Sequence, residues 1–573
     1  MLATRAKQPA AASPGTRDAS TTVPRTRARR PLRAVETNVA SYDRKDPFAA
    51  FNALRKLLAS LPSMIGGCRF KMSEEEQKLS MHLLTIADDC RAFHWVIAFT
   101  SYLDVRDLLA LALSCKRMHD VIFPRHYEYR VIRCKISNIA IWSHLAGNRA
   151  LAANVRHLEI LDERSTESIL IPSDVLITDT ELESSDDELV MHDKQGQLFM
   201  SALSKMASLG VFVWSCNHSL ISLHSIWPTL LKCHSLKSVE INDNLVFGPV
   251  NEEHSTNSTK RKPILPKLSS VLVRSFKKGF GHNKNPELTR VSEMLHHCPN
   301  LEELDIHYNA EMGFVKPQAD DFSLYERWPN LRTLTLTHLT CALDGFEAAS
   351  SFLLAHPNIE VPHLDVGPRA NLAALTLTSG FLPRLRELKC SKELACMIMT
   401  CPSGASAPRP LETIKGVSLT GQQRDHEFLD GLRRYTIKRI ELAGYSELED
   451  IRKLVDCVPN AAWLDIGKKS SAETHKGPVA ISSVVDWANL LTHLPDLSVF
   501  HGVRFFYEVS DGLSMSDRSR IKKNDEVASV IAWKCPNLRR LDHWDEHADK
   551  VIVLLKEPKD GEKIKWEIRR IKL

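Results

Sequence analysis

Apolar and polar positions alternate in a frame that recurs from about residue 150 to the end of the chain. The frame has apolar residues at its first, fourth and sixth positions and is clearest at Leu301, Leu304 and Ile306. Alternation with a period of two is typical of a strand that buries one face. The pattern therefore predicts a long series of short strands. With substitutions, the frame returns at Val155/Leu158/Ile160, Leu236/Val239/Ile241, Leu268/Val271/Val273, Leu331/Leu334/Leu336, Leu372/Leu375/Leu377, Leu385/Leu388/Cys390, Ile437/Ile440/Leu442, Ala461/Leu464/Ile466 and Leu538/Leu541/His543.

Segments with helical periodicity, such as 287–297 and 525–534, separate these strands. Proline ends the preceding helix and asparagine supplies a polar turn in the Pro-Asn steps at 299–300, 329–330, 459–460 and 536–537. A single strand and helix cannot bury their own apolar faces, so neighbouring units must stack. The expected fold is α/β, a solenoid over residues 150–573 with a curved parallel sheet and outer helices.

Three further segments interrupt or end this array. Residues 551–555 and 564–568 predict a terminal hairpin that caps it, with Lys559-Asp560-Gly561 as the turn. An acidic insertion lies near 179–189 and a polar loop near 251–263. Ser184 and Ser185 precede acidic residues, which suits an acidophilic kinase or, equally, an unmodified solvated loop.

The strand frame resembles the leucine-rich repeat. Residues 301–309 fit its L-x-x-L-x-L-x-x-N pattern, with Ile306 in place of the last leucine. The stretch 198–244 and the end of the chain resemble irregular leucine-rich F-box proteins of fungi. This resemblance implies a concave sheet face that holds a target protein.

Side chains alternate along a strand, so the residues beside the buried leucines should line the concave face. The row of threonines among them also fits ordinary β-propensity. The expected target-binding residues are Glu240, Asn242, Glu303, Asp305, His307, Thr333, Thr335, Thr337, Trp463 and Asp465.

A second apolar pattern, over residues 101–118, predicts a helix. Asp104 suits the N-cap, and Asp107 adds negative charge near the positive end of the helix dipole. Such a short helix carries more apolar surface than one stripe can hide, which favours an external partner. The alternative is an amphipathic helix packed on its own domain. Its apolar residues at helical spacing are Leu108, Leu109, Leu111, Ala112, Cys115 and Met118.

This segment resembles the later part of the F-box, which reads roughly L-x-x-x-D/E-L-L-x-x-x-x-V-C-K-x-W. Leu103 matches the first leucine, residues 107–109 the acidic-Leu-Leu step, and residues 114–118 the V-C-K-x-W step. Ser114 and Met118 depart from the usual valine and tryptophan. The family opens its first helix with Leu-Pro-x-Glu, where this chain has Arg91-Ala92-Phe93-His94.

The resemblance implies an F-box at 91–135 and a substrate-recognition subunit of a Skp–cullin–F-box ubiquitin ligase. The F-box would dock on a Skp-type adaptor and, through it, a cullin, while the repeats hold an unknown protein substrate. The alternative is a leucine-rich scaffold that never enters a ligase. The expected adaptor-binding residues are Leu103, Leu108, Leu109, Cys115, Lys116, Met118, Phe93 and Ile97.

Charge is concentrated at the start of the chain. The formal net charge of the 573 residues is +5, and residues 1–45 alone hold ten basic and three acidic residues. This Ala-, Pro-, Ser- and Arg-rich stretch predicts a disordered basic tail. Three alternatives are open for it: a plain solvated tail, a nuclear import signal or a transit peptide. Residues 46–90 predict two helices, over 46–61 and from Ser73 towards Leu84, whose role is open. The remainder is nearly neutral, which argues against nucleic-acid binding.

Composition and motifs narrow the chemistry further. The 13 cysteines form no C-x-x-C pair, and Cys390, Cys396 and Cys401 lack zinc-finger spacing, so we expect free thiols and no metal. No apolar run reaches the ~18–20 residues of a membrane helix. No phosphate-binding loop, dinucleotide fingerprint or nucleophile elbow occurs. The sequence predicts a non-enzymatic protein of the cytoplasm and/or nucleus, without a cofactor.

Overall fold

The computed structural model describes residues 103, 105–114, 116–123, 125–177, 188–216, 221, 223–249, 264–276, 283–309, 315–342, 345–368, 377, 379–402, 404, 408–470, 481–509, 515–545, 549–556 and 564–570. The strands are β1 Val131–Lys135, β2 His157–Leu161, β3 Val211–Trp214, β4 Ser238–Asn242, β5 Ser270–Arg274, β6 Glu303–His307, β7 Thr333–Cys341, β8 Val361–Pro368, β9 Glu387–Cys390, β10 Thr413–Leu419, β11 Arg439–Tyr445, β12 Trp463–Asp465, β13 Lys468–Lys469, β14 Val499–His501, β15 Arg540–Asp542, β16 Lys550–Lys556 and β17 Ile564–Arg570.

The helices alternate with these strands. They are α4 Val105–Ser114, α5 Lys116–Ile122, α6 Ile139–Gly147, α7 Arg149–Ala152, α8 Glu188–Lys205, α9 Leu223–Leu230, α10 Thr289–Leu295, α11 Asp320–Tyr325, α12 Gly345–Ala355, α13 Lys392–Thr400, α14 Gln423–Leu432, α15 Leu448–Cys457, α16 Ile481–Leu491 and α17 Met515–Lys534. Short 3₁₀ turns occur at η2 Ser173–Ile177 and η3 Asn244–Phe247.

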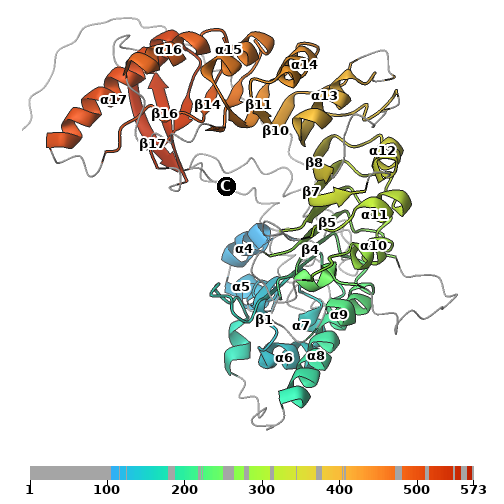
Figure 1. The fold of residues 1–573 in the computed structure, drawn as a ribbon. Coiled ribbons are helices and arrows are strands. Elements are labelled where there is room, and N and C mark those ends of the chain that lie inside the picture. The colour runs from blue at the N-terminus through green and yellow to red at the C-terminus, as the bar shows by residue number, and fades with distance from the viewer. Residues whose placement is uncertain are drawn as a thin grey trace, which may run out of the picture. The chain divides into compact units, whose positions relative to one another are not determined.

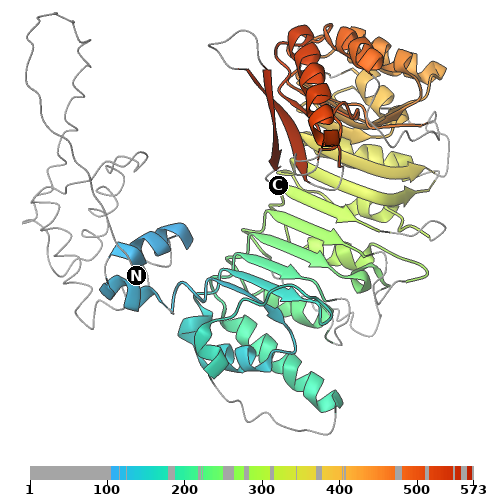
Figure 2. The same cartoon turned by 90° about the vertical axis from the view of Figure 1, so that its left-hand side faces the viewer.

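Strands β1 to β15 form one parallel sheet in which chain order follows spatial order. Each strand pairs with the next, except that β13 pairs with β11 and β12 pairs directly with β14. Helices α6 to α17 lie on one face of this sheet (Figures 1 and 2). The described part of the chain is thus mixed α/β, with a large, mostly parallel sheet of 17 strands and outer helices, as the sequence predicts.

The apolar frame points its residues towards the helices. In β6, for example, Leu304 and Ile306 are fully buried, whereas Glu303 is exposed and Asp305 and His307 are half-buried. The same alternation produces one continuous apolar core from Tyr129 to Leu554. Nine of the expected frames lie on strands of the sheet; the frame at Leu372, Leu375 and Leu377 falls largely outside the described residues.

Several strands were missed because other residues replace the leucines. In most of them a buried position holds an aromatic side chain, a proline or a cysteine, and in β10 the sixth position of the frame is Gly416. The missed copies are Tyr129/Ile132/Cys134 in β1, Leu209/Phe212/Trp214 in β3, Ile359/Pro362/Leu364 in β8, Leu411/Ile414 in β10 and Leu497/Phe500 in β14.

The Pro-Asn steps connect neighbouring units. The side-chain amide of Asn300 donates a hydrogen bond to the carbonyl of Pro266, 2.9 Å away, in the preceding unit. Asn358 and Asn537 donate in the same way, each over 2.8 Å, to the prolines one unit earlier, Pro329 and Pro495. The asparagine therefore forms a bond between units in addition to the polar turn that the sequence predicts.

The array begins earlier than expected. Strand β1 starts at Val131 and pairs with β2, so residues 131–135 belong to the sheet and their assignment to the F-box segment was wrong. The single helix expected to reach Met118 is two helices, α4 ending at Ser114 and α5 carrying Met118. Serine competes for backbone hydrogen bonds, which makes it a poor residue to continue a helix.

Two predicted helices differ from the observed ones in length, and the predicted terminal hairpin is present. The helix expected at 525–534 is the longer α17, and the one expected at 287–297 is the shorter α10. The terminal hairpin is confirmed, because β16 lies antiparallel between β15 and β17. Outside the described residues lie the expectations for 1–102, for Asp104, for the turn at 559–561, for the loop at 251–263 and for most of the acidic insertion, whose end at Glu188 opens α8.

We predict that Leu304→Ala lowers the free energy of unfolding by about 2–5 kcal/mol, because a fully buried leucine leaves a cavity in the core. Denaturant unfolding followed by circular dichroism measures this change. Glu302→Ala, at the exposed neighbouring position, is the control and should stay within about 0.5 kcal/mol of wild type. If both variants lost the same free energy of unfolding, the burial of Leu304 would be contradicted.

Candidate interaction surface

The face of the sheet opposite helices α6 to α17, which we call the open face, carries mostly polar side chains. Because parallel neighbours are in register, the third residues of successive strands form a row across it. In β5 to β15 this row runs through Leu272, Asp305, Thr335, His363, Lys389, Lys415, Glu441, Asp465, His501 and Asp542.

The expected target-binding residues all lie on strands of this face, and nine of the ten have exposed or half-buried side chains: Glu240 and Asn242 in β4, Glu303, Asp305 and His307 in β6, Thr333 and Thr335 in β7, and Trp463 and Asp465 in β12. Thr337 differs, because only 5% of it is exposed and its hydroxyl lies 2.5 Å from Nδ1 of His307. Little of Thr337 is therefore accessible to a target, and its hydroxyl bonds to His307 instead; its role in target binding stays a prediction.

Charges on the open face are paired across strands. Arg274 of β5 lies between Asp305, 2.8 Å away, and Glu240, 3.5 Å away. Lys415 of β10 bridges Glu387 at 2.5 Å and Glu441 at 4.0 Å. The surface is therefore polar and nearly neutral locally. Arg274, Lys415 and Glu441 were not anticipated, although each occupies an outward position of a strand.

Three histidines gather at the middle of the face, on β6, β7 and β8. The rings of His307 and His338 are 5.3 Å apart, and Nε2 of His338 is 3.4 Å from Asp365. His338 has φ of 58°, in the left-handed region, where the register between β7 and β8 shifts. Burial, followed by the charge of Lys389, lowers the pKa of His363 to about 4, so this imidazole is neutral at pH 7.

An aromatic site lies near the end of the array. The guanidinium carbon of Arg439 lies 4.0 Å, and that of Arg540 5.7 Å, from the centre of a Trp463 ring. Burial raises the pKa of the neighbouring Asp465 carboxyl, whose Oδ1 accepts a hydrogen bond from the Gly467 N–H. Stacked arginine and tryptophan side chains are enriched where proteins bind other proteins.

The residues expected to contact an adaptor differ from one another in how much of each side chain is exposed. Leu108 is fully buried, Leu103 and Met118 are half-buried, and Lys116 is exposed, while Cys115, Phe93 and Ile97 lie outside the described residues. Leu109 is 37% exposed. The sequence reasoning missed Leu113, which is 73% exposed and four residues after Leu109; the i, i+4 spacing was the available signal.

The described residues form no metal cluster and no activated thiol. Among the described residues, no group of three or more His, Cys, Asp or Glu side chains could hold a metal ion. The described cysteines are free and buried, and burial raises the pKa of thiols such as Cys298 to about 12 and Cys396 to about 11. These thiols are protonated at neutral pH and therefore weak nucleophiles.

No protein-family model matches the chain, and no curated protein matches it. None of the described helices combines the length and the apolar character needed to cross a membrane.

We predict that Lys389→Met raises the pKa of His363 from about 4 towards the ordinary value of 6.5, because it removes a nearby positive charge. Histidine resonances followed through a pH titration measure the shift. Burial remains in the variant, so the pKa should stay below 6.5, and Lys232→Met, on an exposed lysine, should leave it unchanged.

The sign of the stability effect follows from the same pKa. The folded chain holds His363 less protonated than the unfolded chain does, so His363 contributes stability above pH 6.5 that is lost as the pH falls from 6.5 towards 4. Lys389→Met should weaken this dependence. An unchanged pKa in the variant would contradict the role assigned to Lys389.

Proposed function

We propose that this protein is the substrate-recognition subunit of a Skp–cullin–F-box ubiquitin ligase, with an F-box followed by a leucine-rich-repeat solenoid. The observation that supports it most is the exposure of Leu109 and Leu113 on α4. Two leucines one turn apart on a short helix form an apolar ridge that suits the groove of an adaptor. Lys116 follows on α5 at the lysine of the V-C-K-x-W step.

The open face supports the second half of the proposal. It combines paired charges, threonine hydroxyls and the Trp463 site, without one dominant sign of charge. Such a surface suits a folded protein or an extended peptide better than nucleic acid. The protein then acts by holding its target near the transfer machinery, which raises the effective concentration of the target lysines.

A scaffold outside any ligase is the second candidate. The segment Arg91-Ala92-Phe93-His94, in place of the Leu-Pro-x-Glu opening, favours it. The two candidates share the open face and differ only in whether α4 binds an adaptor.

We predict that the full-length protein co-purifies with the Skp-type adaptor of its organism and that Leu109→Asp combined with Leu113→Asp abolishes this binding. Both side chains are exposed, so the change adds charge to the ridge without entering the core. Leu108→Asp is unsuitable, because Leu108 is buried.

Leu354→Asp is the matched control, since it places the same charge on an exposed leucine of α12 and should leave adaptor binding intact. A folded wild-type protein that does not bind the adaptor would exclude the ligase and leave the scaffold.

We predict that Trp463→Ala combined with Arg540→Ala removes the target proteins that co-purify with the wild type, while adaptor binding persists. The two changes remove the stacked site on the open face. Quantitative mass spectrometry of the purified complexes measures both effects. Trp533→Ala, at a tryptophan of α17 that is 77% exposed, serves as the control. Unchanged target recovery in the double variant would place the target elsewhere.

A further inference from the structure

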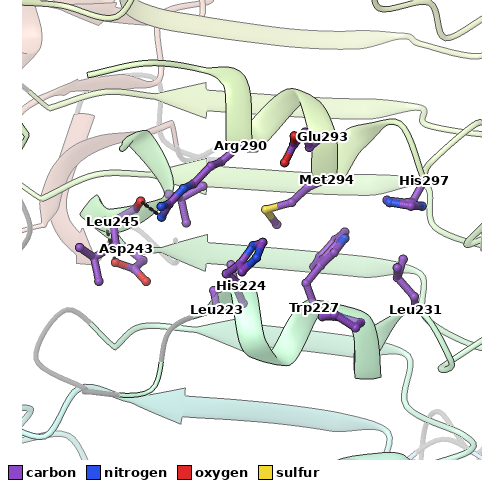
Figure 3. A pocket seen from close by; sticks show the side chains of 12 residues that line it. Leu223, His224, Trp227, Leu231, Asp243, Leu245, Arg290, Glu293, Met294 and His297 are labelled. Carbon is purple, nitrogen blue, oxygen red and sulfur yellow. Dashed lines mark hydrogen bonds between the residues drawn. The ribbon is translucent and has the colours of Figure 1, made fainter. Parts of the chain in front are cut away.

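A pocket of about 460 Å³ lies on the helix-covered side, between α9 and α10, away from the open face (Figure 3). Its volume is within the range of small-molecule sites, which is about 300–1,000 Å³. The walls include Leu223 and Trp227 of α9, Leu231 directly after that helix, and Met294 of α10. These side chains form the apolar part of a mixed lining to which His224, Glu293 and His297 also belong.

A guanidinium group lies at one end of the pocket. Arg290 of α10 extends towards Leu245, and its Nη1 donates a hydrogen bond to the Leu245 carbonyl over 3.1 Å (Figure 3). No carboxylate of the described residues forms an ion pair with Arg290 within 4.0 Å. The remaining guanidinium donors are therefore open to an acceptor from outside the chain.

The carboxylates of the pocket form no ion pair with this guanidinium within 4.0 Å, although the charge of Arg290 partly offsets the effect of burial on the pKa of Asp243. Asp243 is 1% exposed, and its two oxygens already accept hydrogen bonds from the Trp214 indole and the Leu245 N–H, over 3.2 and 2.9 Å. Burial raises the pKa of Asp243, which moves this carboxyl towards its neutral form. Glu293 is exposed and lies at the rim.

The wall of the pocket also contains an unpaired donor. Trp227 is 7% exposed, and its Nε1 is buried without a hydrogen-bond partner. A buried donor without a partner is unfavourable, and most such groups in folded proteins find an acceptor. Figure 3 shows the indole extending from α9 towards α10, into the space that a ligand would share with Met294.

We propose that this pocket binds a small carboxylate with an apolar body. The carboxylate would contact Arg290, and the apolar body would pack against Trp227 and Met294. A neutral molecule of the same shape would forgo the charge-assisted hydrogen bond, and a cation would meet the guanidinium. A ligand acceptor at the inner wall, reached by a shift of the flexible Met294, gives the Trp227 N–H the partner that the chain does not supply. The site is independent of the proposed ligase role.

The test uses the full chain labelled with ¹⁵N in its tryptophan indoles. The Trp227 resonance is identified as the signal that disappears in Trp227→Phe. Benzoate, phenylacetate and cinnamate are added up to millimolar concentration, alongside their neutral amides and benzylamine. We expect a carboxylate to move the Trp227 resonance saturably, and the matching amide to bind at least about tenfold more weakly, as the loss of one charge-assisted contact implies.

Arg290→Met should remove the preference for the carboxylate over the amide while the other indole resonances stay in place, which shows that the variant is folded. Arg384→Met, at an exposed arginine, is the matched control and should behave as wild type. The proposal is overturned if no carboxylate moves the Trp227 resonance. It is equally overturned if amide and carboxylate bind alike, or if Arg290→Met keeps the preference.

Discussion

The stacking of each strand on the next is the interaction on which the rest of this structure depends. No strand–helix unit is large enough to bury its own apolar face, so each one is completed by its neighbours. Two successive N–H groups at the start of a strand donate to one carbonyl of the preceding unit: Arg156 and His157 to Arg130, at 3.0 Å each, and, at the far end, Arg539 and Arg540 to Ser498, at 2.8 and 3.0 Å. Asparagine side chains reinforce the same junction.

This constraint separates the molecule into two layers with different tasks. The side of each strand that faces the helices is committed to the core, and the antiparallel pair β16–β17 ends the sheet. The Trp566 indole N–H on β17 donates to Asp525 of α17 over 2.9 Å, which connects the hairpin to the last helix. Side chains on the open face do not pack into this core. Its charges are neutralised by bonds that cross from strand to strand, which keeps the surface polar and available.

Irregularity in the outer layer has a structural origin. After β4 the described residues form the short turn η3, and Asp243 caps it by accepting the Leu245 N–H. The pocket lies between helices α9 and α10, and Leu245 and Val246 of η3 also line it. The outer layer therefore carries polar groups as well as packed apolar side chains here, namely the unpaired Trp227 N–H and the Arg290 guanidinium.

The sequence by itself determined the architecture, because a period of two and a repeat of about thirty residues leave few ways to bury the same leucines. It also identified the outward row of β4, β6, β7 and β12 and the terminal hairpin. Strands such as β3, with Phe212 and Trp214 at the buried positions, were missed because the core accepts any apolar side chain that fills the space.

Only the tertiary structure decided which outward residues are accessible and which groups meet. Thr337 is covered and Leu113 is exposed, although their local sequence patterns resemble those of their neighbours. The bridge from Glu240 through Arg274 to Asp305 joins residues more than sixty positions apart, and the pocket joins α9 to α10 across a similar distance. Contacts of this kind join residues of different repeats and depend on how the repeats stack. The sequence of one repeat therefore does not reveal them.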